Sequence, residues 1–255
     1  MRFFHLLSFF VVFTFAQRQQ PFSPQLLQEV KEVWVDDYGD YYFANSQKFS
    51  VTKYDSLGEQ KAEFFSSIPF QLLSVTNPLA IPIFSEVKQE LSFIDQNLNF
   101  LKEKINFSEA FFHVKSVFVE DWQYLWVIDE VQKKIVKYDY QNQAIVKSYF
   151  YNASLQGLKN FVVWKDTVYL IKDQLFEVYH LNKGLQLSQS IPKLEKVKRD
   201  AQGVFLYSQN SIYQYTEDKG VDLIFEIKGA SSVTDNYKDR FAIQDNKLYL
   251  YTSKK

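Results

Sequence analysis

Residues 134–139 read KIVKYD, and this short pattern decides the fold because it recurs along the chain. Apolar and polar residues alternate in it, which is the pattern of a half-buried β-strand. An aromatic or aliphatic residue stands near the end of each copy. The other copies are KFSVTKYD (48–55), ELSFID (90–95), LFEVYH (175–180), SIYQYT (211–216) and KLYLYT (247–252). Six strands of one type predict a repeat protein.

The spacing of the copies predicts the kind of repeat. Their closing residues lie 40, 44, 41, 36 and 36 positions apart, and a period of about 40 is typical of the four-stranded blades of a β-propeller. These closing residues are Tyr54, Ile94, Tyr138, Tyr179, Tyr215 and Tyr251. Hairpin patterns at 33–43, 117–127 and 162–170 supply further alternating strands. We therefore predict an all-β chain folded as a six-bladed β-propeller.

Other all-β architectures stay open at this point. Five or seven blades are alternatives, because the second repeat (69–104, with Pro78 and Pro82) is the least regular. An open β-sheet array and a two-sheet sandwich are further alternatives. A ring needs closing, since an exposed sheet edge invites aggregation. The last copy has only three strands, so we expect the segment 21–30 to supply the fourth.

The first sixteen residues, MRFFHLLSFFVVFTFA, have the pattern of a secretory signal peptide. Arg2 gives a positive start, residues 6–15 form a short apolar core, and Ala16 precedes a polar run. An uncleaved anchor and a buried N-terminal strand are the alternatives. We expect cleavage after Ala16, a single propeller domain over 17–255, and no transmembrane segment after cleavage, because no later stretch approaches membrane length.

Composition excludes several classes of function. The 255 residues carry 29 Lys and Arg against 30 Asp and Glu, and this balance argues against a nucleic-acid partner or an anionic membrane surface. There is no cysteine, which excludes disulfides, thiol catalysis and thiolate metal sites. Aromatic residues make up 18% of the chain, in keeping with β structure.

Three segments carry a resemblance to a known family. They are VWVDDYGDYYF (33–43), SVTNPLAIPIFSEVKQELSFIDQNLN (74–99) and YLWVIDEVQKKIVKYD (124–139). They resemble a family of uncharacterised exported β-propeller-like proteins from Bacteroidota, most specifically at 76–79, Phe84 and Asp95. The resemblance implies a Gram-negative envelope protein with a propeller of NHL or quinoprotein-like shape. It brings no reaction and no catalytic residue, and 80–82 departs from the plain aliphatic run expected there.

Standard catalytic motifs are missing from the sequence. It contains no HExxH, GxSxG, GxGxxG or GxxxxGK[ST] pattern, so zinc-protease, acyl-transfer and nucleotide-binding loops are not predicted. The three histidines, His5, His113 and His180, are scattered. We predict no catalytic constellation and no cofactor other than calcium.

Acidic residues supply the two remaining leads. Asp36, Asp37 and Asp40 surround Gly39, and such a loop forms either a hairpin turn or a calcium site. Glu120 and Asp121 precede Trp122, whose ring is a candidate anchor for a partner or ligand if exposed. Asp200 is a further candidate carboxylate. Trp34 and Trp164 are expected to pack between blades.

These observations favour a non-enzymatic interaction module. We expect an exported propeller in the periplasm or at the outer membrane, with an envelope protein or outer-membrane assembly as partner. The alternative is a propeller that binds carbohydrate or another small ligand, with hydrolase or lyase chemistry included. Polar groups converging on the central channel favour the alternative, whereas an apolar plugged channel excludes it. A calcium-stabilised structural protein is the third hypothesis.

Overall fold

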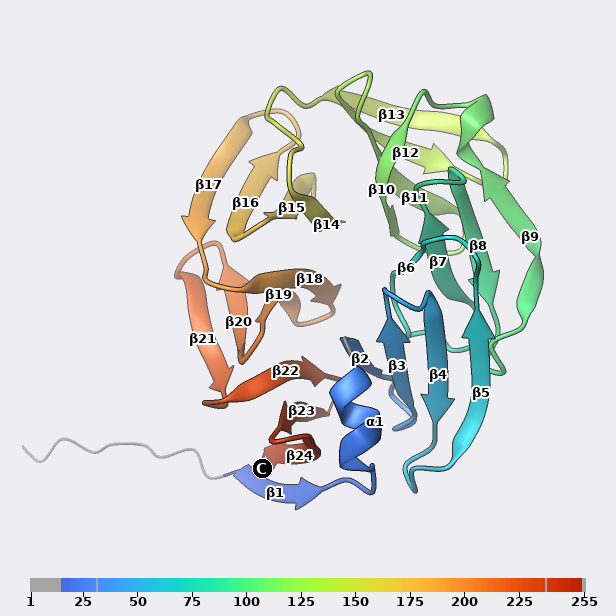
Figure 1. Ribbon diagram of the computed structural model, residues 1–255. Coiled ribbons are helices and arrows are strands. Elements are labelled where there is room, and N and C mark those ends of the chain that lie inside the picture. The colour runs from blue at the N-terminus through green and yellow to red at the C-terminus, as the bar shows by residue number, and fades with distance from the viewer. Residues whose placement is uncertain (1–14, 31, 237, 254–255) are drawn as a thin grey trace, which may run out of the picture.

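Six four-stranded antiparallel sheets form a closed ring in the computed structural model (Figure 1). The structure describes residues 15–30, 32–236 and 238–253. The ring confirms the six-bladed propeller and excludes the five-bladed, seven-bladed and open alternatives. Its repeat unit is the predicted one, because the six copies of the short pattern form the third strand of each blade.

The blades are numbered here in chain order. Blade 1 consists of β2 (Glu32–Val35), β3 (Tyr41–Asn45), β4 (Ser50–Tyr54) and β5 (Gln60–Phe65). Blade 2 consists of β6 (Gln71–Leu72), β7 (Ile81–Ser85), β8 (Glu90–Ile94) and β9 (Phe100–Asn106). Blade 3 consists of β10 (Val114–Val119), β11 (Tyr124–Asp129), β12 (Lys134–Asp139) and β13 (Ala144–Phe150). Blade 4 consists of β14 (Leu158–Trp164), β15 (Thr167–Lys172), β16 (Leu175–His180) and β17 (Gly184–Ser190). Blade 5 consists of β18 (Leu194–Asp200), β19 (Gly203–Ser208), β20 (Ser211–Thr216) and β21 (Gly220–Glu226).

Blade 6 closes the ring with strands from both ends of the chain. It consists of β22 (Ala230–Asp235), β23 (Asp239–Gln244), β24 (Lys247–Ser253) and β1 (Phe15–Gln19). Strand β1 pairs with β24 from Phe15 opposite Ser253 to Gln19 opposite Tyr249. The predicted closure by the N-terminal part of the chain is confirmed, but residues 15–19 make it, instead of 21–30.

The expected closing segment contains a short helix because its residues favour one. Ser23 caps helix α1 (Pro24–Glu29) by accepting a hydrogen bond from the Leu26 amide at 3.3 Å, and Pro24 takes the first helical position, where proline is tolerated. Leu27 is buried in the apolar layer between blades 1 and 6. A single 3-10 turn, η1 (Phe107–Glu109), follows β9.

The predicted leader lies mostly outside the described residues, which begin at Phe15. Residues 1–14, including Arg2 and His5, are therefore not discussed further. Cleavage after Ala16 stays a prediction, and Gln17, Arg18 and Gln19 remain paired with β24 after such a cut. Among the described residues, no helix has the length and apolar character needed to cross a membrane.

The aspartate that ends several copies of the pattern stabilises the hairpin turn that follows it. The Asp55 side chain accepts hydrogen bonds at 2.9 Å from the amides of Leu57 and Glu59, and Asp95 does the same for Asn97 and Asn99 at 2.8 and 2.9 Å. Each carboxylate thus satisfies the backbone of the hairpin turn that it begins.

The hydrophobic core is divided into layers between neighbouring blades. The closing aromatic residues lie in these layers: Tyr138 contacts Phe111 with ring centroids 5.2 Å apart, and Tyr251 contacts Phe225 at 5.3 Å. Edge-to-face pairs of this kind add stabilisation beyond simple burial. The high aromatic content of the sequence is thereby explained.

Blade 2 is the irregular blade, as the sequence predicts. Its innermost strand β6 has only two residues, Gln71 and Leu72. The segment 73–80, which contains Pro78, replaces the rest of that strand and lies along the central cavity. Irregular backbone therefore reaches the axis of the ring at this one blade and changes the shape of the cavity.

Candidate functional site

A cavity of about 1220 Å³ occupies the centre of the ring. Its walls come from the first strands of the blades, β2, β6, β10, β14 and β18, with the end of β22 and the segment 73–80. In a propeller the first strand of each blade lies nearest the axis, so side chains far apart in the sequence meet here. The channel is neither plugged nor purely apolar.

Two lysines dominate one wall of this cavity. Lys196 and Lys198 are two positions apart on β18, so their side chains leave the strand on the same face. The Lys196 Nζ lies 4.0 Å from the ring centroid of Trp34, and the Lys198 Nζ lies 4.8 Å from it. Both amines also lie over the ring of Tyr207, at 5.5 and 4.7 Å. Blade 5 thus extends two cations toward an indole of blade 1.

The polar partners of both lysines are loosely placed. Lys196 Nζ lies 3.3 Å from Glu32 Oε1, and Lys198 Nζ lies 3.5 Å from Asp235 Oδ1 and 3.4 Å from the Thr234 hydroxyl. The short hydrogen bond to Asp235 comes from the hydroxyl of Tyr207 at 2.6 Å. The amines therefore keep donor capacity that the protein uses only weakly.

The buried Lys172 shows what a purely structural pair looks like in this fold. Lys172 Nζ lies 2.6 Å from Glu177 Oε2, 3.0 Å from the Tyr151 hydroxyl and 2.8 Å from the Ser154 carbonyl. All its donors are engaged at short distance, and it does not line the cavity. Lys198 differs on both counts.

The surroundings of Lys198 change its acidity. Burial and, to a lesser degree, the nearby charge of Lys196 lower the pKa of Lys198 to about 8, although Asp235 and Glu32 oppose both effects. Burial also raises the pKa of Tyr207 well above its ordinary range, helped by the charge of Asp235. The Tyr207 hydroxyl therefore stays protonated and donates a hydrogen bond to Asp235. A part of the Lys198 population is an uncharged amine near neutral pH.

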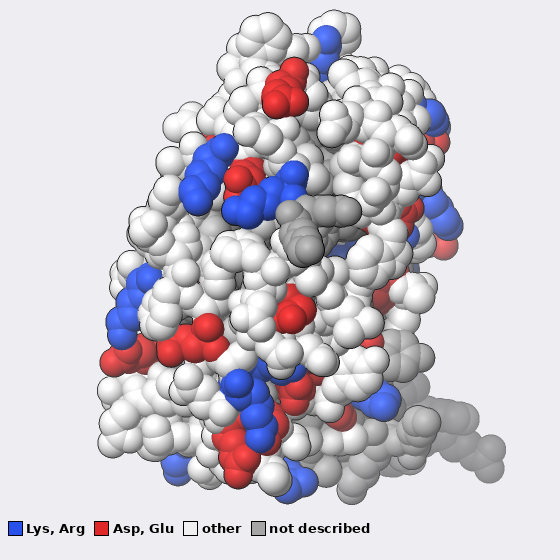
Figure 2. All heavy atoms as spheres, turned by 90° about the vertical axis from the view of Figure 1, so that its right-hand side faces the viewer, with Lys and Arg blue, Asp and Glu red and all other residues white. Residues whose placement is uncertain are grey.

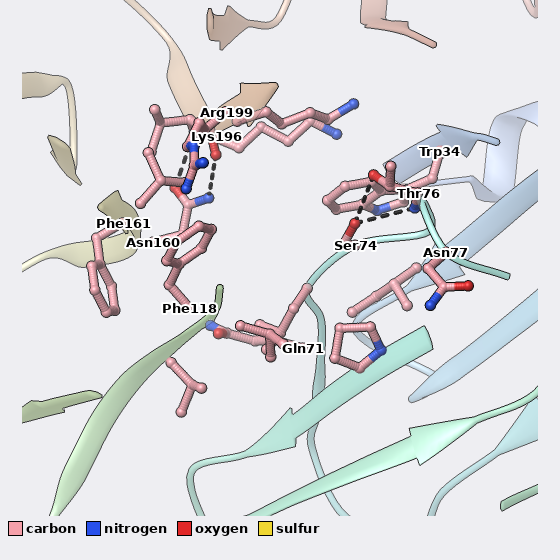
Figure 3. A pocket seen from close by; sticks show the side chains of 18 of the residues that line it. Trp34, Gln71, Ser74, Thr76, Asn77, Phe118, Asn160, Phe161, Lys196 and Arg199 are labelled. Carbon is pink, nitrogen blue, oxygen red and sulfur yellow. Dashed lines mark hydrogen bonds between the residues drawn. The ribbon is translucent and has the colours of Figure 1, made fainter. Parts of the chain in front are cut away.

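The indole of Trp34 carries an unused donor beside these amines. Its side chain is 6% exposed, and its Nε1–H has no hydrogen-bond partner among the residues that the structure describes. An unpaired buried donor costs free energy, and an acceptor from outside the chain would satisfy it. Figure 3 shows Lys196 extending toward Trp34, with Ser74 and Thr76 next to the indole.

The strands β10 and β14 add aromatic and amide side chains to the wall of the cavity. Phe118 lines the cavity from β10, and Phe161 of β14 lies at its border, buried between blades 3 and 4 (Figure 3). Asn160 is fixed by two hydrogen bonds to the backbone of Val197, at 3.0 and 3.2 Å, so it ties β14 to β18. The guanidinium of Arg199 lies 6.0 Å from the ring of Trp164. The cavity thus offers aromatic faces together with a few fixed polar groups.

The predicted binding residues of the third blade line the same cavity. Trp122 is 63% exposed, as the partner or ligand prediction requires. Glu120 Oε2 accepts the Trp126 indole N–H at 2.9 Å and pairs with Lys137 at 2.7 Å. Asp121 Oδ1 accepts two backbone amides of the adjoining turn, at 2.7 and 2.8 Å. These two carboxylates hold the loop that presents Trp122.

Asp200 lines the cavity as well, but its carboxylate is also used locally. It accepts the amides of Gln202 at 2.6 Å and Gly203 at 3.2 Å, and burial raises its pKa. The candidate carboxylates of blades 3 and 5 thus share one cavity, each engaged in its own turn.

The acidic loop of blade 1 forms a tight turn. Asp36 Oδ1 accepts the amides of Tyr38 and Asp40 at 3.0 and 2.9 Å, and Asp36 Oδ2 accepts the Tyr42 hydroxyl at 3.0 Å. Asp40 pairs with Lys53 at 2.8 Å, and Asp37 lines the cavity. Across the described part of the chain, no three His, Asp or Glu side chains are grouped so that they can hold a metal ion. Calcium binding by this loop stays a prediction.

Sequence reasoning missed Lys196 and Lys198. The available signal was the sequence LEKVKRD (194–200), in which five of seven residues are charged although the strand lies next to the axis of the ring. Trp34 was expected to pack between blades, and it does contribute to the layer between blades 1 and 2. Its place in the cavity wall was not predicted.

Comparisons with known proteins identify the fold and nothing narrower. No protein-family profile matches the sequence, and no curated protein matches it. Virginiamycin B lyase from Staphylococcus aureus superposes with a TM-score of 0.54 at 8% identity, covering 94% of this chain and 99% of that one. A streptogramin B lyase structure gives 0.54 at 12% identity, covering 94% and 88%. The WD40 domain of Pan2 from Neurospora crassa gives 0.53 at 9% identity, covering 94% and 96%. The resemblance to exported Bacteroidota proteins stays a prediction.

Proposed function

We propose that this propeller binds a small organic ligand in its central cavity, and that the ligand carries a carboxylate. One observation carries the proposal. The unpartnered indole N–H of Trp34 lies in the cavity wall beside the weakly engaged amines of Lys196 and Lys198. The two amines lie over the face of the indole and the N–H lies at its edge, and the acceptor that suits two amines best is an ionised oxygen group.

The size and lining of the cavity support a small organic molecule. Ligand sites commonly measure about 300–1,000 Å³ and combine aromatic walls with a few placed polar groups. This cavity is about 1220 Å³, so a ligand of that class fits with some water. Phe118 offers an apolar face for its body.

Binding of simple aromatic carboxylates tests the proposal. We would measure the affinity of benzoate and 4-(hydroxymethyl)benzoate by calorimetry and Trp fluorescence, with benzamide as the uncharged analogue. We expect both carboxylates to bind at least about tenfold more tightly than benzamide, a difference of about 1.4 kcal/mol. Absence of carboxylate binding, or equal binding of benzamide, contradicts the proposal.

A pair of tryptophan variants locates the ligand. Trp34→Phe keeps an aromatic ring and removes the N–H donor, so we expect weaker carboxylate binding. Trp126→Phe is the matched control, because the Trp126 N–H already donates to Glu120 and its side chain lies outside the cavity lining. Equal loss in both variants contradicts the placement.

The second candidate function is protein interaction, and exposed aromatic rings favour it. Tyr38 is 81% exposed and Trp122 is 63% exposed. Both lie on loops that follow first strands, and hence on the same face of the ring. Figure 2 shows the side that carries β5 and β9, where Lys, Arg, Asp and Glu are intermixed among uncharged side chains that cover most of the surface. Exposed rings of this kind are frequent anchors of protein partners.

The setting that we propose for this second function is the bacterial envelope. The leader-like residues 1–16 support it, and an envelope protein or outer-membrane assembly is the expected partner. Affinity purification of the full chain from solubilised envelopes, compared with a Tyr38→Ala/Trp122→Ala variant, tests it. Capture of a stoichiometric partner that the variant loses supports the function. Purification of the chain alone, or absence of the chain from the envelope fraction, argues against it.

A further inference from the structure

We propose that Lys198 captures the aldehyde or ketone group of a ligand as an imine, while Lys196 and the Trp34 N–H hold the carboxylate of the same molecule. The inference rests on the proposed function, because it assumes that a small carboxylate occupies the cavity. It goes further by assigning a covalent step to one nitrogen atom and by narrowing the ligand class to carbonyl-bearing acids.

The position of Lys198 suits a nucleophile. Its side chain keeps 21% of its surface exposed, and it lines the cavity. Its hydrogen-bonding distances of 3.4–3.5 Å leave the amine able to turn toward a ligand. Lys172, with 8% exposure and three short contacts, is held in place by comparison. Among the two, only Lys198 meets the geometric needs of an attacking amine.

The electrostatic setting makes this amine reactive near neutral pH. With a pKa of about 8, roughly a quarter of Lys198 is uncharged at pH 7.5, against roughly a thousandth for an ordinary lysine. Burial beside a second cation is a known way to activate an amine for imine formation. Lys196 therefore has two effects, since it attracts the carboxylate and keeps its neighbour uncharged.

The charged and titratable groups around Lys198 come from several elements. β18 contributes Lys196 and Asp200, β19 contributes Tyr207, β22 contributes Asp235, β23 contributes Arg240 and β2 contributes Glu32. The acids favour the charged form of the amine, whereas burial and Lys196 favour the neutral form. The low pKa shows that burial and Lys196 outweigh the acids.

The proposed step balances without any oxidant or reductant. The Nζ lone pair attacks the carbonyl carbon, a C–N bond forms, and the C=O π pair moves to the oxygen, which takes a proton. That proton comes from the nitrogen by way of the nearest base, Asp235 Oδ1 at 3.5 Å, and the second N–H proton follows the same route as the nitrogen lone pair expels the hydroxyl group. The C–O bond then breaks with the release of water, so an amine and a carbonyl give an imine and one water molecule.

Reductive trapping of the full chain tests this step. Glyoxylate and 4-carboxybenzaldehyde are the probes, sodium cyanoborohydride supplies hydride, and peptide mass spectrometry locates the secondary amine formed. From the neutral fractions above, we expect Lys198 to be labelled on the order of a hundredfold more than an exposed lysine at pH 7.5. Labelling spread evenly over exposed lysines overturns the proposal.

Two variants separate reactivity from mere accessibility. Lys198→Arg keeps the positive charge but forms no imine, so the specific label disappears. Lys196→Gln removes the charge that depresses the pKa of Lys198, so the half-maximal pH of Lys198 labelling moves upward. An unchanged pH profile contradicts the assigned effect of Lys196, and Lys198 labelling that rises only above pH 10 in the wild type contradicts the proposal as a whole.

Matched alcohols distinguish this inference from the proposed function. Glycolate and 4-(hydroxymethyl)benzoate have the same carboxylates and lack the carbonyl group. If these alcohols bind and the carbonyl probes leave no label on Lys198, the binding function stands and the imine fails. If neither class binds, both proposals fail.

Discussion

Replacing Lys198 with methionine is expected to stabilise the protein at neutral pH. The substitution removes an amine that burial has made costly to charge, and it keeps a flexible chain of similar length against the rings of Trp34 and Tyr207. Asp235 keeps the short hydrogen bond from Tyr207 at 2.6 Å. A residue that serves a site and not the fold has this signature.

The pKa of Lys198 sets the magnitude and the pH dependence. It falls from 10.5 to about 8 on folding, and each pKa unit corresponds to about 1.4 kcal/mol, so the folded state carries about 3 kcal/mol of unfavourable free energy below pH 8. The unfolded chain binds more protons than the folded chain between pH 8 and 10.5, so wild-type stability rises with pH in this window. The advantage of Lys198→Met should therefore fall to about 1 kcal/mol at pH 10.

Urea unfolding of wild type and variant at pH 7 and pH 10 measures both quantities. Lys172→Met is the control with the opposite sign, because it leaves the buried carboxylate of Glu177 without its cation. We expect that control to lose about 3 kcal/mol or more. A destabilised Lys198→Met at pH 7, or a difference that stays constant with pH, refutes the reasoning about Lys198.

Three further predictions concern the fold. Tyr42→Phe removes the buried hydroxyl that donates a hydrogen bond to Asp36. We expect it to lower the free energy of unfolding, measured in urea, by about 1–2 kcal/mol. An unchanged free energy of unfolding would show that the turn does not need this hydrogen bond. Leu125→Ala, at a fully buried position, should cost about 2–5 kcal/mol, and a loss under 1 kcal/mol would contradict the packing between blades 2 and 3. Deleting residues 1–20 removes β1, and we expect this deletion to cost about 3 kcal/mol of unfolding free energy and to promote self-association, which light scattering detects. Deleting residues 1–16 is the control, because it keeps Gln17–Gln19 against β24. Identical behaviour of the two deletions would contradict closure by β1.

The fold could be read from the sequence because one blade repeats with a regular spacing. Each closing aromatic residue packs between blades, as Tyr138 does against Phe111, and each repeat carries its own turn chemistry, as Asp55 and Asp95 show. Local patterns of this kind agree with the global fold. The closing strand was expected at 21–30, but residues 15–19 form it. The helix cap at Ser23 explains why the segment 21–30 contains a helix instead.

Of the candidate site, the sequence predicted only residues at the rim of the cavity. Trp122 stood out because it follows two acids in a loop, and the structure places it at the cavity with high exposure. Lys196 and Lys198 lie more than 160 positions after Trp34 in the sequence, and only ring closure brings β18 and β2 together at the axis. No local sequence pattern indicates that these side chains lie close together.

The sharing of blade 6 between the two ends of the chain has a consequence for synthesis. Gln17 and Tyr251, whose side chains are joined at 3.2 Å, are 234 residues apart. At about 5–20 residues per second, β1 waits roughly 10–50 s on the ribosome before β24 exists. A product interrupted before β24 cannot make this pairing, whatever the state of its first five blades. The last strand pairing of the ring therefore forms only after the whole stretch from Gln17 to Tyr251 has been made.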